Sequence, residues 1–393
     1  MGESVTDRVR KVMAAASVSQ AAFAEAIGLA PDKVSKSLSG VRRFTSLDLA
    51  RIAEFGNTTV DWLLTGREPL RPAFAARTSA PSADEHGRGR LKDLVERFTT
   101  AHEVIDLLGI SPELPELPSV RSDLKRYVDQ GMALAEDALA QLAVAGSPAM
   151  GGLDTADLLQ AMERAFGVDV AKIGLPDGID GAAWQVDGFR LIMIARTNVP
   201  TRQRFTLAHE LGHILAKDAQ DLLTETHLSP GHQKDLTEVR ANVFAANLLM
   251  PRSEILSEAQ EGDLTDEQVT SLVVRFQVSP SALAARLVQL GVIDTETADR
   301  LRGLTTQTCY WLTGQSDFLE ARTTWSQAKR LPFRPAQLLY EAYLAGETTL
   351  RPLAAYTGLD VDKMRELLEP EPAAYEGKSS GTDVDEGDLV FQP

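Results

Sequence analysis

The stretch "FTLAHELGHILAKD", Phe205–Asp218, places two histidines four residues apart, with a glutamate directly after the first. Residues i and i+4 of an α-helix lie on the same face, so His209 and His213 can direct ring nitrogens at one metal ion. The helical period turns Glu210 about 100° away from His209, from where its carboxylate can reach a metal-bound water. We therefore predict a helix that carries two metal ligands and a general base.

The alternative is a helix with two histidines that binds nothing. Apolar residues surround the motif, which indicates a largely buried helix, and buried histidines need polar partners. Gly212 within the helix costs about 1 kcal/mol relative to alanine, so its presence indicates the close approach of a neighbouring backbone. These features favour the metal site. The apolar neighbours are Phe205, Leu207, Ala208, Leu211, Ile214 and Leu215.

Two histidines leave a tetrahedral metal site incomplete, so a third protein ligand is expected. Glu238 opens a second helical stretch, "EVRANVFAANLLMP", 25 residues after His213, which allows a loop and a return helix packed against the first. Asn242, four residues later, shares that face and can hydrogen-bond the second nitrogen of a ligand histidine. Two histidines of the intervening loop, His227 and His232, are alternative third ligands. Either of them, or Arg204, could instead stabilise a transition-state oxyanion.

"RQRFTLAHELGHILAKD" followed by "EVRANVFAANLLMP" resembles the ImmA/IrrE family of metallopeptidases, and the resemblance covers residues 155–295. It implies a zincin-like, gluzincin-type α+β domain with a small sheet, and an endopeptidase that uses Zn²⁺, with Mn²⁺ as an alternative in vitro. It also implies that His209, His213 and Glu238 are the metal ligands and that Glu210 is the general base.

The amino-terminal segment "SQAAFAEAIGLAPDKVSKSLSG" has a helix-turn-helix layout, with a turn that contains glycine and a second helix that begins at Pro31. The second helix would enter the major groove of DNA, with Arg42 and Arg43 near phosphates. The segment resembles XRE/Cro-type repressor domains over residues 5–66. Because single modules of this kind bind weakly, a homodimer on an operator is implied. The candidate groove-facing residues are Asp32, Lys33, Ser35 and Lys36.

Patterns along the chain predict a multidomain, mainly α protein. Two strand candidates, "AAWQV" and "FRLIMIA", are joined by Asp187-Gly188, which is a strong hairpin signal. The carboxy-terminal helices do not disclose a function. The predicted parts are a five-helix helix-turn-helix domain (1–70), a flexible linker (71–90), a helical connector (91–150), the peptidase domain (151–300), a helical module (301–370) and an acidic disordered tail (371–393).

Charge is segregated along the chain, whose net charge is −16. Residues 1–77 carry 11 Lys and Arg against 8 Asp and Glu, whereas residues 366–393 carry one Lys against 8 acidic residues. The negative net charge of the whole chain therefore does not exclude a DNA-binding amino terminus. No apolar run approaches the length of a membrane span, and the single cysteine, Cys309, excludes an internal disulfide framework. We expect a cytoplasmic protein with no membrane partner.

The leading hypothesis is a DNA-binding transcription regulator with a zinc endopeptidase domain. By resemblance, its substrate is a repressor of the XRE class, cleaved during a stress or mobile-element response. A second candidate substrate is the protein's own amino-terminal module, cut in the exposed linker between Arg67 and Arg90. One alternative is a non-proteolytic regulator or antitoxin-like protein whose metal domain senses or scaffolds. Another alternative is a peptidase with no role at DNA. The cleavage site and the activating signal are not encoded in any motif of the chain.

Overall fold

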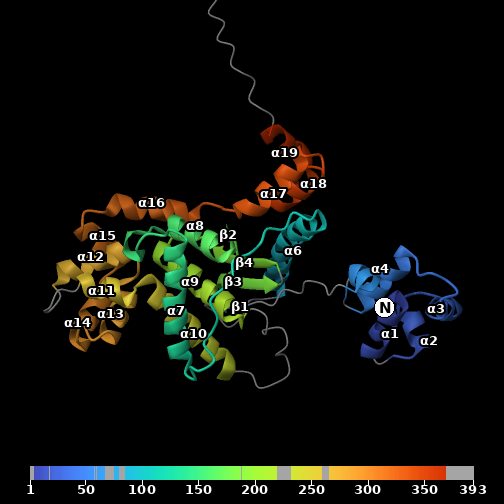
Figure 1. The fold of residues 1–393 in the computed structure, drawn as a ribbon, viewed down its shortest axis with the longest axis horizontal. Coiled ribbons are helices and arrows are strands. Elements are labelled where there is room, and N and C mark those ends of the chain that lie inside the picture. Colours follow the sequence, from blue (N-terminus) through green and yellow to red (C-terminus); the bar gives the residue numbers. More distant parts are fainter. Residues whose placement is uncertain are drawn as a thin grey trace, which may run out of the picture. The chain divides into compact units, whose positions relative to one another are not determined.

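The computed structural model describes residues 4–16, 18–56, 58, 60–66, 75–78, 85–186, 188–218, 232–258 and 265–368. The chain forms two compact units, Met1–Thr99 with Pro112–Pro332, and Thr100–Ser111 with Phe333–Pro393 (Figure 1). Most described residues lie in helices, which confirms a mainly α protein. The predicted acidic tail, 371–393, lies outside the described residues.

The amino-terminal part, over the described residues 4–66, folds into five short helices, as the sequence predicts. Ser4 and Thr45 each form a capping box that starts a helix, whereas Ala30 provides no side-chain cap before Pro31. Phe23 and Val34 are fully buried at the centre of the small core. The helices are α1 (Val5–Ala15), α2 (Gln20–Ala26), α3 (Pro31–Leu38), α4 (Ser46–Phe55) and α5 (Val60–Thr65).

A sheet of four strands within the described residues, in the order β1-β3-β4-β2, lies against the helix that carries the two histidines. Strands β3 (Ile179–Val186) and β4 (Phe189–Ala195) are antiparallel and meet at Gly188, which has φ 78° and confirms the predicted hairpin. The sequence did not predict β2 (Asp169–Ile173), which pairs in parallel with β4, or β1 (Ala75–Thr78), which pairs antiparallel with β3.

Helix α9 (Pro200–Ala216) is buried between this sheet and two other helices, α7 (Tyr127–Val144) and α10 (His232–Leu249). A Cβ at Gly212 would lie 2.9 Å from the Phe244 ring and 3.4 Å from the Cα of Ala241, both on α10. The close approach predicted from Gly212 is therefore confirmed. Helix α8 (Thr155–Phe166) contributes Leu158, Met162 and other buried residues to the same core.

Three predicted boundaries differ from the structure. Strand β1 and the first residues of helix α6 (Glu85–Leu107) lie inside the range predicted as a flexible linker, 71–90. Helix α7, in the predicted connector, packs Leu134, Ala135 and Ala138 into the main core, because its apolar face needs a partner. Helices α15 (Thr306–Leu312) and α16 (Ser316–Gln327) belong to the same unit as the sheet rather than to a separate module.

The remaining helices surround these elements or form the second unit. None of the described helices combines the length and apolarity that a membrane crossing requires. In the first unit these are η1 (Met150–Gly152), α11 (Arg252–Glu258), α12 (Asp266–Phe276), α13 (Pro280–Gln289) and α14 (Thr295–Arg302). The second unit contains the end of α6 with α17 (Phe333–Leu344), α18 (Arg351–Thr357) and α19 (Val361–Leu368).

Candidate metal centre

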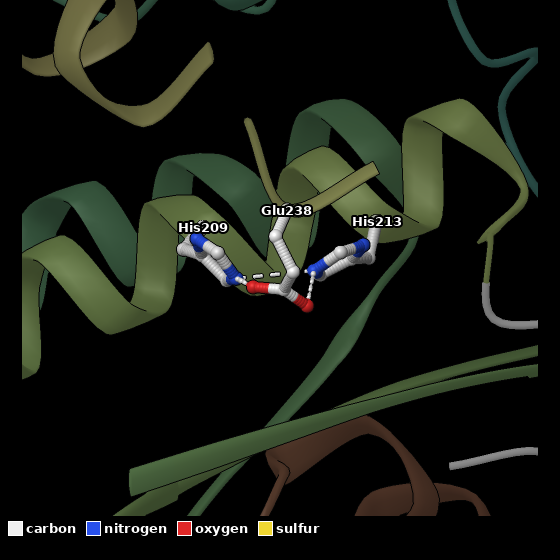
Figure 2. Close-up of side chains that lie close together, drawn as sticks. All are labelled: His209, His213 and Glu238. Atoms are coloured by element: carbon white, nitrogen blue, oxygen red, sulfur yellow. Dashed lines mark hydrogen bonds and ion pairs between the residues drawn. The ribbon is translucent and has the colours of Figure 1, made fainter. Parts of the chain in front are cut away.

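Three side chains converge at the crossing of α9 and α10. His209 and His213 project from one face of α9, and the Glu238 carboxylate, from α10, lies between their rings (Figure 2). The two histidine Nε2 atoms are 3.0 Å apart, and the Glu238 oxygens lie 3.3 Å from Nε2 of His209 and 3.5 Å from Nε2 of His213. The histidines are 0% and 2% exposed, whereas Glu238 is 33% exposed, so the cluster opens towards solvent on the Glu238 side.

Each histidine ring is oriented through its other nitrogen. Nδ1 of His209 lies 3.2 Å from Oδ1 of Asn242, the hydrogen bond that the sequence predicts. Nδ1 of His213 lies 3.2 Å from Oδ2 of Asp218. Since both partners offer oxygen acceptors, Nδ1 donates in each ring and Nε2 faces Glu238. Both rings are therefore oriented with the nitrogen that would bind a metal ion directed into the cluster.

The partner of His213 depends on a turn that the sequence did not reveal. Helix α9 ends at Lys217, which adopts φ 59° and ψ 23°, a left-handed conformation uncommon for a residue with a side chain. This turn brings the next residue, Asp218, back against His213. Arg240 on α10 forms an ion pair with Asp218 and donates a 2.8 Å hydrogen bond to Oε1 of Gln130. Asp218 is thus held by Arg240 of α10, and Arg240 is in turn held by Gln130 of α7.

Glu210 is fully buried and lies against strand β3. A Cβ at Gly181 would stand 2.8 Å from Oε1 of Glu210 and 2.5 Å from Cγ2 of Thr206. Glycine at this position therefore makes room for the Glu210 carboxylate between α9 and the sheet. Glu210 also interacts electrostatically with His213, which places its charge next to the cluster.

Interactions within the cluster shift the pKa values of His213 and Glu238. Burial opposes the charged form of His213, but hydrogen bonds to Asp218 and Glu238 outweigh it and raise the pKa of His213 to about 10. Burial also opposes the charged form of Glu238, but bonds with the two histidines hold the pKa of that carboxyl far below its usual range. Both shifts come from the close packing of two histidines and a carboxylate, an arrangement in which a bound metal ion would take the place of a proton.

The donor set fits a zinc ion. Nitrogen ligands about 2.0–2.1 Å from a tetrahedral zinc lie about 3.3 Å apart, close to the separations within this cluster. Two histidines, one carboxylate and one open position form a known arrangement of catalytic zinc sites. The described residues that could hold the ion are His209, His213 and Glu238, whose ligand atoms all lie within 4.8 Å of one another.

Of the three oxyanion candidates, only Arg204 has a side chain that the structure describes. Arg204 is completely buried elsewhere, with Nη2 3.7 Å from Sδ of Met150, and burial lowers the pKa of Arg204 to about 9. The side chain of Arg204 leaves α9 towards Met150 and Arg322, so its described contacts do not support that role. His227 lies outside the described residues, as does the side chain of His232, whose backbone begins α10.

The residues predicted to contact DNA divide into two groups. Those on α3 and Arg43 are exposed, and the Lys36 ammonium pairs within the helix with Asp32, 3.4 Å away. Arg42 instead donates to Ser37 Oγ at 3.0 Å and pairs at 2.7 Å with Asp48, a buried residue of α4. Its guanidinium is thus held by the protein's own structure. The exposed group is Asp32, Lys33, Ser35, Lys36 and Arg43.

Sequence comparison adds an independent observation. Residues 163–288 match the peptidase family described as the IrrE N-terminal-like domain. Two curated relatives, from Deinococcus radiodurans and Deinococcus deserti, are each named "Radiation response metalloprotease IrrE". They are 30% identical over 185 residues and 28% identical over 160 residues, which cover 45% and 40% of this chain. The region around the cluster is therefore similar to a metallopeptidase domain.

The chain spans about half the length of these relatives, 52% and 55% respectively. The matched family region includes α9, α10 and the strands β2, β3 and β4. It does not include β1 or the amino-terminal helices. The likeness therefore concerns the sheet and the candidate metal centre.

Proposed function

We propose that this protein is a zinc-dependent endopeptidase joined to a DNA-binding domain. The observation that carries the peptidase proposal is the convergence of two buried histidines and a glutamate from a second helix. Glu210, the neighbour of His209, is buried beside that cluster. The similarity of residues 163–288 to a peptidase family supports the same conclusion.

The ligands and the base have separate tasks in this proposal. His209, His213 and Glu238 would hold the zinc ion, which when bound supplies a Lewis acid for the peptide carbonyl and acidifies a water molecule. Glu210 accepts the proton of the attacking water and then delivers it to the leaving amine. Its burial between α9 and β3 fixes the carboxylate before substrate arrives, so little reorganisation accompanies proton transfer.

The amino-terminal helices are proposed to bind double-stranded DNA as a homodimer, in the manner of XRE-type repressors. The exposed, charged surface of α3 supports the proposal, with Lys33 and Lys36 on the solvent side and Val34 and Leu38 in the core. In this proposal the exposed Arg43 contacts phosphate, whereas Arg42, paired with Asp48, holds the segment between α3 and α4 in position. Binding would be dominated by phosphate contacts and would weaken as salt rises.

The proposed substrate is a repressor protein of the XRE class, cleaved in a stress or mobile-element response. The names of the two relatives, which refer to a radiation response, support a stress role. Joining a peptidase to a DNA-binding domain raises its effective concentration near a repressor bound on the same DNA.

Mass spectrometry of purified proteins tests the peptidase proposal. The full chain is loaded with one equivalent of zinc and incubated with repressors encoded near its own gene, alongside Glu210→Gln and Glu238→Gln. We expect new fragments with the unmodified chain, and about 10²- to 10⁴-fold slower cleavage by Glu210→Gln with its zinc content retained. Glu238→Gln should lose both zinc and cleavage. Fragments that form equally fast with the unmodified chain and Glu210→Gln would contradict the proposal.

A further inference from the structure

Strand β1 occupies the edge of the sheet next to the candidate active site. It follows the amino-terminal helices in sequence and pairs only with β3 among the described strands. The register places Ala75 opposite Ala183, Ala76 opposite Ala182 and Arg77 opposite Gly181. The other edge, at β2, is covered by Arg330, which exchanges two 2.8 Å main-chain hydrogen bonds with Lys172.

The outer edge of β3 lies beside the proposed general base. Gly181 packs against the Glu210 carboxylate so closely that a Cβ there would stand 2.8 Å from Oε1. Because Arg77 pairs with Gly181, the backbone of β1 passes the sheet residue that contacts Glu210. If β1 were absent, β3 would present its unpaired N–H and C=O groups at this point.

We propose that β1 is an intramolecular competitor of the peptide substrate. An extended peptide can add to an open sheet edge through main-chain hydrogen bonds, and the edge of β3 can accept one strand at a time. β1 must therefore leave before a substrate segment pairs with β3 next to Glu210. This inference rests on the proposed endopeptidase function and adds to it a mode of substrate binding and a form of autoinhibition.

Strand β1 has features that favour its displacement from β3. It is four residues long, and its register with β3 shifts between Arg77 and Thr78. Its sequence, Ala-Ala-Arg-Thr, contains no large apolar residue, and a strand of this length forms few main-chain hydrogen bonds. The competition is local, since the strand is tethered close to its site and acts at a high effective concentration.

Hydrogen–deuterium exchange on the full chain tests the competition without requiring catalysis. The zinc-loaded Glu210→Gln protein is mixed with a synthetic peptide that carries the sequence of residues 71–82. We expect amides of β1 to exchange at least about tenfold faster with saturating peptide, while amides of β3 remain protected. A peptide in which the residues matching Ala76 and Arg77 are both proline should have no effect. Peptide that binds while β1 keeps its full protection would overturn the proposal.

A matched pair of variants supplies the second measurement. Ala76→Pro with Arg77→Pro removes adjacent N–H groups, one of which must face β3, whereas Ala76→Ser with Arg77→Lys keeps both. In the Glu210→Gln background, the proline variant should bind the fluorescent 71–82 peptide at least about tenfold more tightly than the control variant. Equal affinity for both variants, or failure of the proline variant to bind peptide, would overturn the competition.

Cleavage then separates this inference from the function on which it rests. With Glu210 present, the proline variant should cut a quenched fluorescent form of the 71–82 peptide faster than the control variant. If the proline variant binds the peptide more tightly but cleaves no peptide or repressor, the endopeptidase function is contradicted and the strand competition is supported. If the proline and control variants bind and cleave the peptide equally, the competition is contradicted and the endopeptidase function is supported.

Discussion

Helices α9 and α3 each carry a polar pair four residues apart, but the two pairs have opposite surroundings. His209 and His213 on α9 are 0% and 2% exposed, and a carboxylate from another helix lies between them. Asp32 and Lys36 on α3 have side chains that are 66% and 60% exposed and that pair with each other. The same spacing thus gives a buried pair that contacts a second helix in α9, and a solvent-exposed pair in α3.

The difference shows which polar pairs a fold fixes in place. An exposed helical ion pair contributes about 0.3–0.5 kcal/mol, so Lys36 can leave Asp32 for a phosphate at little cost. Each α9 histidine is instead held by a residue from outside its own helix, Asn242 or Asp218. The candidate metal centre therefore has a fixed geometry in the structure without an ion, whereas the α3 surface offers charge without a fixed geometry.

A variant that displaces Glu210, the proposed general base, should have the largest effect on peptide hydrolysis. Gly181→Ala would place a Cβ against Glu210 and Thr206 without touching a metal ligand. We expect peptide hydrolysis to fall by about 10²-fold, because a displacement near 1 Å misaligns proton transfer, while zinc content is retained. Gly174→Ala, whose Cβ would meet no atom within 4 Å, is the matched control. Equal hydrolysis by the two variants would show that Glu210 does not depend on β3.

A variant that weakens the hydrogen bond holding the His213 ring should have a smaller effect, on zinc affinity. Asp218→Asn weakens the acceptor for Nδ1 of His213 and removes the charge that pairs with Arg240. Zinc affinity, measured by competition with a chromophoric chelator, should fall by about 10- to 100-fold. Asp177→Asn removes the same charge from an exposed position and should leave the affinity unchanged. Loss of affinity in both variants would assign the effect to net charge.

Much of the α9 site follows from local rules. The helical period places His209 and His213 on one face, and Asn242 can be predicted as a partner because it lies one turn after Glu238. Gly212 indicated a close helix crossing because glycine is disfavoured inside a helix without such a reason. These predictions needed only spacing within one helix or a comparison of two helical segments.

Other parts of the site depend on contacts that spacing does not encode. Asp218 reaches His213 only because Lys217 adopts a left-handed turn, and no glycine marks that turn. Strand β1 has no alternating apolar pattern, so only its pairing with β3 identifies it. Arg204 resembled a candidate by proximity in sequence, but its helical position directs it into the core.

The smallest effects should separate neighbouring arginines of the amino-terminal domain. Arg42→Ala would leave the buried carboxylate of Asp48 without its 2.7 Å ion pair, and should lower the domain's free energy of unfolding by roughly 1–3 kcal/mol. Arg43→Ala, at an exposed position, should change it by less than about 0.5 kcal/mol. Hydrogen exchange in α4 of the full chain measures both changes.

The pH dependence and the DNA affinity of these variants complete the test. Burial raises the pKa of Asp48, but bonds from Thr45 and Arg42 outweigh it and hold that pKa below its usual value. The stability that Arg42 adds is therefore fully present above the ordinary pKa of a carboxyl group and is lost as pH falls through the lowered pKa of Asp48. If Arg43 contacts phosphate, Arg43→Ala should reduce the salt dependence of duplex binding by about one unit. Arg42→Ala with unchanged stability would show that this residue is as free for DNA as its neighbour.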